Sequence, residues 1–298
     1  MASKRILITG ASGMLGSTLV DLWKNHFDIY STQRQNFDNN PSNNSFHFDL
    51  LNNNYDKLLE WSEPDIIVHC AAITDVDFCE KNFELAKKVN GESVKKLFTK
   101  DSHSRLIFIS SDSVFSDEVS MPMEKHKPDP INAYGMSKYI GEKHIRDAGK
   151  PHVSVRTTIV GKNINSLKVS LVEWIINSVK NKKEITLFED ALFSPITIWH
   201  LANELKWIIE NDVFGIFHIS GNGIISKYEF GYKICKELGL DTTLIRKGSI
   251  DDVSFDAKRA KNQALDCSHY SQISGRPLPN MDETLDTIIQ HFKRGAYA

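Results

Sequence analysis

The feature that most constrains the fold is a glycine pattern directly after a short apolar segment near the N-terminus. Residues 5–9 read Arg-Ile-Leu-Ile-Thr, and Gly10, Gly13 and Gly16 follow before an amphipathic stretch. A strand, a glycine turn and a helix in this order are typical of a dinucleotide-binding unit. Gly10 would permit the tight turn, Gly13 would let the backbone approach a pyrophosphate, and Gly16 would let helix and strand pack closely.

A phosphate-binding loop of the P-loop type is the competing interpretation of these glycines. That loop needs a lysine directly after its last glycine. This chain has Ser17 and Thr18 there instead. The pattern therefore favours a dinucleotide.

Apolar segments and helical patterns alternate along the first half of the chain, which predicts an α/β fold with a Rossmann-type, doubly wound parallel sheet. From residue 161 onward helices alternate with shorter strands, and no linker separates the two parts. We expect a smaller, interleaved C-terminal α/β portion that binds the substrate. The expected division is residues 1–160 with about 197–224 for the cofactor domain, and about 161–196 with 225–298 for the substrate-binding portion.

The end of the second predicted strand indicates which dinucleotide would bind. An acidic residue there would bind the ribose 2′-hydroxyl of NAD, but the chain has Ser31, Thr32 and Arg34. A cation favours a 2′-phosphate, so the sequence predicts NADP(H), with NAD(H) as the alternative. Asp49 and Leu50 follow the third predicted strand, at an end that would lie near the adenine.

Small residues follow the fourth predicted strand, residues 65–69. Ala71 and Ala72 leave room there for a cofactor. Thr74 and Asp75 come next, either as N-terminal caps of the following helix or as substrate contacts. That helix is expected to run on toward residue 98.

One segment in the middle of the chain carries the residues that we expect to perform chemistry. Ser111 follows an apolar segment and so lies at the carboxyl end of a buried strand, where parallel sheets bind ligands. Tyr134 and Lys138 lie one turn apart on the helix predicted for residues 132–148. Because a nearby ammonium group lowers the pKa of a phenol, the three side chains can exchange a proton with a substrate oxygen while a hydride moves.

Two other Tyr-x-x-x-Lys pairs show that this spacing alone is weak evidence. They are Tyr139 with Lys143 and Tyr232 with Lys236. Tyr139 points about 140° away from Tyr134 around the helix, and no serine-bearing strand precedes Tyr232. Most such pairs are ordinary helix surface, and Tyr134 is selected because it agrees with the strand end and the glycine turn.

Composition and charge exclude several classes of protein. The chain has 298 residues, a formal net charge of −2 and a pI of about 6.6. This balance gives no basis for binding nucleic acid or an anionic membrane. The first apolar run is too short for a signal peptide and none could span a bilayer, so we expect a cytoplasmic protein. Widely spaced cysteines and scattered histidines predict reduced thiols and no metal site.

Several motifs together name a family. They are Gly10-x-x-Gly13-x-x-Gly16, Cys70-Ala71-Ala72, Ile109-Ser110-Ser111-Asp112, Pro130-x-Asn132-x-Tyr134-Gly135-x-Ser137-Lys138, Phe193-x-Pro195 and a weaker tail at 259–266. These motifs resemble the extended short-chain dehydrogenase/reductases, and among them the dTDP-4-dehydrorhamnose reductase family most closely. The resemblance covers nearly the whole chain, with a specific first half and a diffuse second half.

The resemblance implies an NADPH-dependent reduction of the 4-keto group of a nucleotide-diphospho-6-deoxyhexose, in deoxysugar biosynthesis for surface polysaccharide. Ser111 would orient the keto oxygen, Tyr134 would protonate it, and Lys138 would bind the nicotinamide ribose. Implied cofactor contacts, besides Tyr134 and Lys138, are Gly10, Ser12, Gly13, Met14, Leu15, Gly16, Arg34, Asp49, Leu50, Ala71 and Ala72. Implied substrate contacts are Thr74, Asp75, Val76, Ser113 and Arg259.

The chain departs from the family pattern at three positions. Ser113 stands where the family usually has a tyrosine, which removes an aromatic group from the sugar pocket. Thr18 replaces a glutamate that is tied to magnesium and dimerisation in some members, so no metal is expected. The family's C-terminal Arg-Pro reads Arg259-Ala260 here, which leaves Arg259 as a candidate diphosphate contact.

Other functions stay open at this stage. The regulatory subunit of methionine adenosyltransferase resembles the same reductases, and such a protein would bind NADP without turnover. A nucleotide-sugar epimerase or dehydratase would use a similar site, although dehydratases usually carry an acidic pair where this chain has Asp112 and Ser113. The nucleotide and the sugar are not determined, and a homodimer is the assembly that we allow for.

Overall fold

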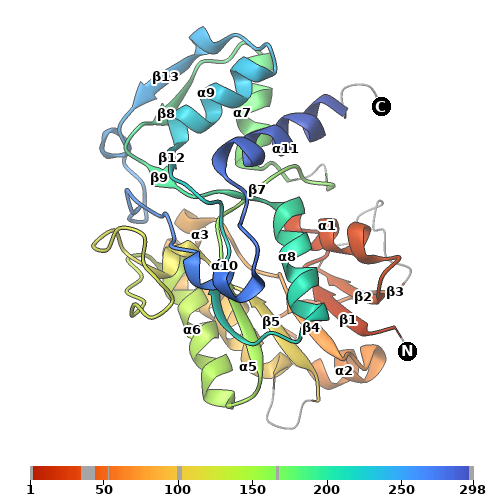
Figure 1. The fold of residues 1–298 in the computed structure, drawn as a ribbon. Helices are drawn as coiled ribbons and strands as arrows, with labels where there is room; N and C mark the ends of the chain where they lie inside the picture. Colours follow the sequence, from red (N-terminus) through yellow and green to blue (C-terminus); the bar gives the residue numbers. More distant parts are fainter. Residues whose placement is uncertain (1–2, 35–43, 53, 99–102, 166–167, 295–298) are drawn as a thin grey trace.

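The computed structural model describes residues 3–34, 44–52, 54–98, 103–165 and 168–294. Within these residues, seven parallel strands form one central sheet (Figure 1). The chain builds the sheet outward from β1, first to one side and then to the other, which confirms the predicted doubly wound α/β fold. In spatial order the strands are β11 (Gly215–His218), β6 (His152–Arg156), β5 (Arg105–Ile109), β4 (Ile66–His69), β1 (Arg5–Thr9), β2 (Asp28–Gln33) and β3 (Asn44–His47).

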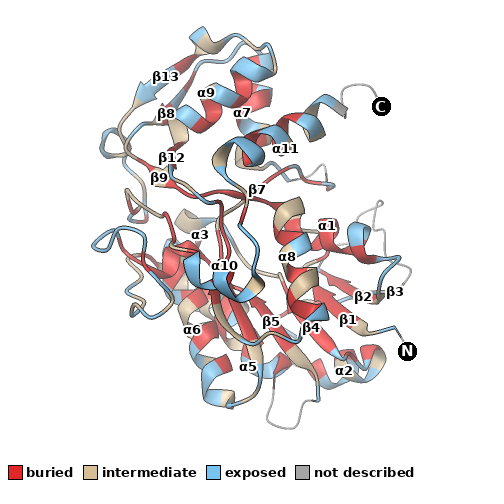
Figure 2. Cartoon of the chain, viewed as in Figure 1, coloured by how far each residue is buried: buried red, intermediate tan, exposed pale blue. Residues whose placement is uncertain are grey.

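Helices cover both faces of this sheet because its strands are apolar on both sides. One core cluster joins the strands to α1, α8 and α10, and a second cluster joins the opposite face to α2, α5 and α6. Figure 2 shows the buried residues along the strands and on the helix sides that face them. These helices are α1 (Met14–Trp23), α2 (Tyr55–Ser62), α5 (Ser93–Leu97), α6 (Ala133–Ala148), α8 (Ile198–Glu210) and α10 (Ser268–Ser274).

A smaller lobe, in the upper part of Figure 1, has its own apolar clusters. After its first part the chain returns to the main sheet as α8 and β11, so the two lobes interleave. On this basis we propose the division into residues 1–160 with about 197–224, and about 161–196 with 225–298, although α10, within the last range, packs on the main sheet. The lobe and its connections contain β7 (Ile159–Val160), α7 (Leu171–Lys180), β8 (Ile185–Phe188), β9 (Leu192–Phe193), β10 (Ile196–Thr197), β12 (Ile225–Ser226), α9 (Lys227–Glu237), β13 (Ile245–Gly248) and α11 (Met281–Arg294).

The helix that was expected to run on toward residue 98 is interrupted. It consists of α3 (Val76–Lys81), α4 (Phe83–Ala86), a π-helical turn at Lys87–Glu92, and α5. Asn90 in the π turn is fully buried. Its amide bonds the backbone N–H and carbonyl of Ile73 at 2.7 and 2.9 Å and the Ser137 hydroxyl at 2.9 Å. We attribute the widened turn to these contacts, since π turns often occur beside functional sites.

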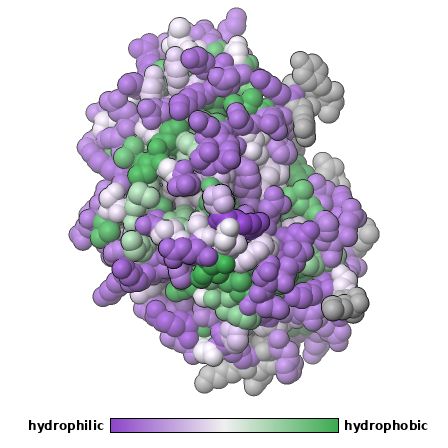
Figure 3. Space-filling model, in the orientation of Figure 1, coloured by the Kyte–Doolittle hydropathy of each residue, from purple (hydrophilic) through white to green (hydrophobic). Residues whose placement is uncertain are grey.

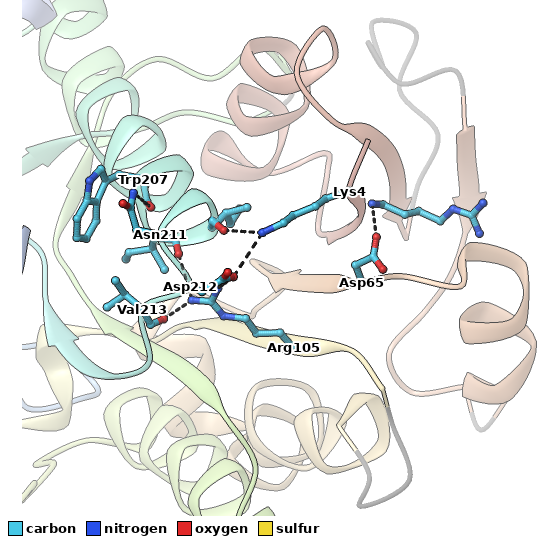
Figure 4. A network of polar contacts seen from close by, with 10 residues as sticks. Lys4, Asp65, Arg105, Trp207, Asn211, Asp212 and Val213 are labelled. Atoms are coloured by element: carbon cyan, nitrogen blue, oxygen red, sulfur yellow. Dashed lines mark hydrogen bonds and ion pairs between the residues drawn. The ribbon is translucent and has the colours of Figure 1, made fainter. Parts of the chain in front are cut away.

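A polar network at the amino ends of the strands attaches the turn between α8 and β11 to the sheet (Figure 4). Asp212 in this turn pairs with Lys4 and with Arg105, each at an N–O distance of 3.4 Å. Arg105 also donates hydrogen bonds to the carbonyls of Ile208 and Val213. These contacts fix the edge of the sheet opposite to the strand ends where ligands bind.

The outer surface is mainly polar. On the face shown in Figure 3, hydrophilic residues cover most of the surface and hydrophobic residues appear in separate small areas. Among the described residues, none of the helices is both long and apolar enough to cross a bilayer.

Candidate active site

The predicted site residues come together around one cavity. It has a volume of about 1040 Å³ and is lined by the ends of β1, β2, β4 and β5 and by residues of the smaller lobe. This is the edge at which doubly wound sheets bind ligands. Every residue that the sequence indicated lines it: Gly10, Ser12, Gly13, Met14, Leu15, Gly16, Arg34, Asp49, Leu50, Ala71, Ala72, Thr74, Asp75, Val76, Ser111, Ser113, Tyr134, Lys138 and Arg259.

The glycine turn between β1 and α1 brings bare backbone to the cavity. Gly10 has a φ of +74°, and a Cβ atom there would lie 2.7 Å from the Cα atom of Ala71. A Cβ atom at Gly16 would lie 2.3 Å from the carbonyl oxygen of Gly10. The open backbone stands at the N-terminus of α1, where a helix binds a pyrophosphate. The residues present therefore fit a dinucleotide.

Two cations line the cavity near the end of β2. Arg34 directly follows this strand, and Lys168 comes from the segment before α7. Partial desolvation and then the charge of Arg34 lower the pKa of Lys168. Neither side chain forms an ion pair with a described residue, so both charges are available to an anion. Asp49 and Leu50, which follow β3, line the same cavity.

Ser111 lies just beyond β5, and its hydroxyl is held in place by its neighbours. It donates a hydrogen bond to Asp112 Oδ1 at 2.8 Å and accepts one from the Ser113 N–H at 3.1 Å. Asp112 also accepts hydrogen bonds from the hydroxyls of Ser113, at 3.1 Å, and Thr158. A buried carboxylate with three donors fixes the orientation of this whole strand end.

Helix α6 carries Tyr134 at its first turn, where Asn132 caps the helix by accepting a hydrogen bond from the Gly135 N–H at 2.9 Å. Burial raises the pKa of Tyr134; an interaction with Ser111 opposes this shift, and the charge of Asp112 adds to it. The net shift of this pKa is therefore upward, opposite to the lowering that the sequence predicts. The phenol is held in its proton-bearing form.

Lys138 follows one turn later on α6 and is almost fully buried, with 2% of its surface exposed. Its ammonium nitrogen lies 4.3 Å from the centroid of the Phe108 ring and forms no ion pair with a described residue. Burial lowers its pKa to about 8, while interactions with Cys70 and Glu142 oppose this shift. A buried cation that lines the cavity without a carboxylate partner is available to a ligand.

The predicted substrate contacts lie on two sides of the cavity. Asp75 has a structural role, since it caps α3 by accepting a hydrogen bond from the Phe78 N–H at 2.9 Å. Arg259 pairs with Asp77 of α3 at 2.8 Å, which attaches the C-terminal segment to the cavity wall. Its other terminal nitrogen, Nη1, is buried without a hydrogen-bond partner among the described residues.

Many lining residues were not predicted from the sequence, among them the polar residues Lys168, Lys227 and Gln263. Gln263 donates a hydrogen bond to the Ser113 hydroxyl at 3.0 Å. It falls in the 259–266 tail that carried part of the family resemblance, so that signal was present in the sequence. Lys227 begins α9, and nothing in the sequence distinguishes it from a lysine on an exposed helix end.

Comparisons with known proteins agree with this geometry. The chain is 29% identical over 295 residues to the probable low-salt glycan biosynthesis reductase Agl14 of Haloferax volcanii, covering 96% of this chain and 97% of the relative. It is 27% identical over 286 residues to the methionine adenosyltransferase 2 subunit beta of Bos taurus, covering 91% and 83%. The crystal structure of dTDP-4-dehydrorhamnose reductase from Bacillus anthracis in complex with NADP is similar with a TM-score of 0.86 at 27% identity, covering 97% and 99%.

The family itself is identified by a match along almost the entire chain. The family model described as RmlD substrate binding domain matches residues 4–294. This range includes both lobes and every residue of the cavity. The protein therefore belongs to the RmlD substrate binding domain family.

Proposed function

We propose that the protein reduces the 4-keto group of a nucleotide-diphospho-6-deoxyhexose with NADPH, in the synthesis of a deoxysugar for a surface glycan. The observation that carries this proposal is that Ser111, Tyr134 and Lys138 line the same cavity as the glycine turn. The similar structure from Bacillus anthracis is named as a reductase of this kind, and the relative from Haloferax volcanii as a glycan biosynthesis reductase. A cytoplasmic location and a homodimer are further parts of the proposal.

The cofactor side of the proposal rests on charge. Arg34 and Lys168 line the cavity near the end of β2 without an ion pair to any described residue. Two cations match the two negative charges of a ribose 2′-phosphate, whereas NAD offers a neutral hydroxyl at this position. This favours NADPH, with NADH as the weaker alternative.

The side chains of the cavity divide the proton chemistry between them. NADPH, when bound, supplies the hydride. Ser111 orients the keto oxygen through its hydroxyl, and Tyr134 donates its phenolic proton to that oxygen. Because burial raises the pKa of Tyr134, the phenol keeps its proton until a substrate oxygen accepts it. The positive charge of Lys138 stabilises the phenolate that remains, and its N–H groups can bind ribose hydroxyls.

A second candidate function is a regulatory subunit of methionine adenosyltransferase. The observation that favours it is the 27% identity to the subunit beta of Bos taurus over 91% of this chain. Such a protein would bind NADPH and leave keto sugars unchanged. The complete set of Ser111, Tyr134 and Lys138 favours the reductase.

One assay separates the two candidates. NADPH oxidation is followed with a panel of nucleotide-diphospho-4-keto-6-deoxy sugars that carry dTDP, UDP, GDP or CDP. Oxidation with one of them supports the reductase and identifies its nucleotide. NADPH binding without oxidation across the panel, together with a changed activity of added methionine adenosyltransferase, would support the regulatory role instead.

A further inference from the structure

The part of the cavity wall that residues 188–192, 227 and 250–263 of the smaller lobe contribute has a composition of its own. It is apolar except for two cations and one amide, and no carboxylate belongs to it among the described residues. Its members are Phe188, Ala191, Leu192, Lys227, Ile250, Phe255, Arg259, Ala260 and Gln263. A wall with two positive charges and no negative charge favours an anionic ligand.

Lys227 is the less expected of these cations. It is the first residue of α9, where the N-terminal end of the helix dipole is positive and disfavours a lysine. Its ammonium nitrogen lies 3.4 Å from the centroid of the Phe193 ring, a cation–π contact. Its backbone N–H donates to the carbonyl of Ala191 at 3.0 Å, so the residue is attached to the cavity wall at two points.

Lys227 forms no ion pair with a carboxylate in the part of the chain that the structure describes. Asp112 is near enough to act on it electrostatically but forms no ion pair with it. That carboxylate already accepts hydrogen bonds from the hydroxyls of Ser111, Ser113 and Thr158. Burial lowers the pKa of Lys227 to about 8. An anion from a ligand would remove this electrostatic cost.

Arg259, on the same wall, also has a donor group without a partner among the described residues. One of its terminal nitrogens pairs with Asp77, and the other, Nη1, is buried without a partner among the residues that the structure describes. A buried N–H group without an acceptor is costly unless a ligand supplies one. Both cations of the wall thus have unused donors.

The apolar part of the wall indicates which anion would fit. The rings of Phe188 and Phe255 pack edge to face at a centroid distance of 6.1 Å, and both are half-buried and line the cavity. Aromatic rings at a cavity wall suit a flat heterocycle such as a nucleobase. The guanidinium of Arg259 lies over the Phe255 ring, 5.0 Å from its centroid, so the positive charge and the rings are side by side. A wall with aromatic rings and two cations matches a nucleoside diphosphate better than a sugar carboxylate, which carries one charge and no flat ring.

We propose that Lys227 is a substrate-binding residue that, together with Nη1 of Arg259, contacts the diphosphate of the nucleotide sugar. This inference rests on the proposed function and adds a specific residue to it. Lys227 lies near Asp112, and Asp112 is adjacent to Ser111. A cation in this region can bind the diphosphate while the other end of the hexose reaches Ser111 and Tyr134.

The test uses nucleoside diphosphates as probes with the NADPH-saturated protein. Binding of dTDP, UDP, GDP and CDP is measured by calorimetry for the wild type, Lys227→Met, Lys227→Arg and the control Lys233→Met. Lys233 lies on the same helix and is exposed. We expect Lys227→Met to weaken the diphosphate that binds best by about 10- to 100-fold, the effect of one lost charge-assisted hydrogen bond.

The control measurements decide what such a loss means. Lys227→Arg should recover most of the affinity, Lys233→Met should bind like the wild type, and NADPH affinity should be equal in all four proteins. Unchanged diphosphate affinity in Lys227→Met overturns the proposal, as does a wild type that binds none of the four probes. An equal loss in Lys233→Met also overturns it, because the effect would then be general.

Turnover separates this inference from the proposed function. If the wild type reduces a keto sugar and Lys227→Met has an unchanged KM, the function stands and the role of Lys227 is rejected. If no sugar is reduced but diphosphate binding depends on Lys227, the reductase is rejected and the role of Lys227 is supported.

Discussion

Glu142 on α6 accepts two hydrogen bonds from Arg156 on β6, from Nε at 3.0 Å and from Nη2 at 2.7 Å. The two side chains are 3% and 2% exposed. The same carboxylate accepts a hydrogen bond at 2.6 Å from Ser110, the residue before Ser111. The carboxylate of Glu142 therefore connects the helix that carries Tyr134 to β6 and to the end of β5, next to Ser111.

This connection predicts a large loss of stability when one partner is removed. Arg156→Met would leave the carboxylate of Glu142 buried without its cation, and we expect a loss of about 3–5 kcal/mol in the free energy of unfolding. Urea denaturation followed by circular dichroism measures it. The exposed pair of Arg246 and Glu184 is the matched control: Arg246→Met should change the stability far less, because water already screens both charges. Equal losses in both variants would contradict the role of burial.

Removal of the proposed proton donor should affect chemistry and spare cofactor binding. Tyr134→Phe is expected to lower kcat by about 10²- to 10⁴-fold, the usual contribution of general acid catalysis. The dissociation constant for NADPH, measured by fluorescence titration, should stay within a factor of about 3, because a single hydroxyl is lost. Tyr139→Phe on the same helix is the control and should keep full activity. Wild-type turnover in Tyr134→Phe would reject Tyr134 as the acid.

The pKa values of two buried lysines set the alkaline side of the pH profile. Burial lowers the pKa of Lys138 and of Lys227 to about 8. The protonated form of each is the one that the proposals use, so kcat/KM should fall as the pH rises through about 8. In Lys227→Met the limb that remains belongs to Lys138. A profile that stays flat up to pH 10 would show that neither ammonium group is needed in the free protein.

The cations near the end of β2 should determine the preference for NADPH. Arg34→Gln and Lys168→Gln are each expected to weaken NADPH binding by about 10-fold, and the double variant by about 100-fold, through lost contacts to the 2′-phosphate. NADH binding should change little, because NADH has no phosphate at this position. Titrations with both cofactors measure the ratio. An equal loss of affinity for NADH would mean that the two residues shape the cavity wall near the end of β2 and do not act through the 2′-phosphate.

Local patterns in the sequence predicted the fold and the general position of the site. The glycine turn can be recognised in the sequence because Gly10 has a positive φ, a backbone conformation that few other residues adopt. The strands can be predicted from the sequence because they are apolar on both faces. Such requirements involve residues that are close together in the sequence, so a local pattern is enough to recognise them.

The interruption of the helix between α3 and α5 could not be predicted from a local pattern. Asn90 widens the helix because its amide bonds the backbone of Ile73 and the hydroxyl of Ser137. The last of these contacts joins residues 47 positions apart. A periodic pattern shows which side of a helix is apolar, but it does not show that a polar side chain will find partners in another element.

The sequence by itself determined the doubly wound sheet, the glycine turn and the candidate residues Ser111, Tyr134 and Lys138. Only the tertiary structure decided the electrostatics of the cavity, since the pKa of Tyr134 is raised by burial where the sequence had predicted a lowering by Lys138. It also decided that Lys227 of the smaller lobe lines the same cavity as the end of β5 and lies near Asp112. Desolvation and charge act through space, and a linear pattern records neither the neighbours of a side chain nor its distance from water.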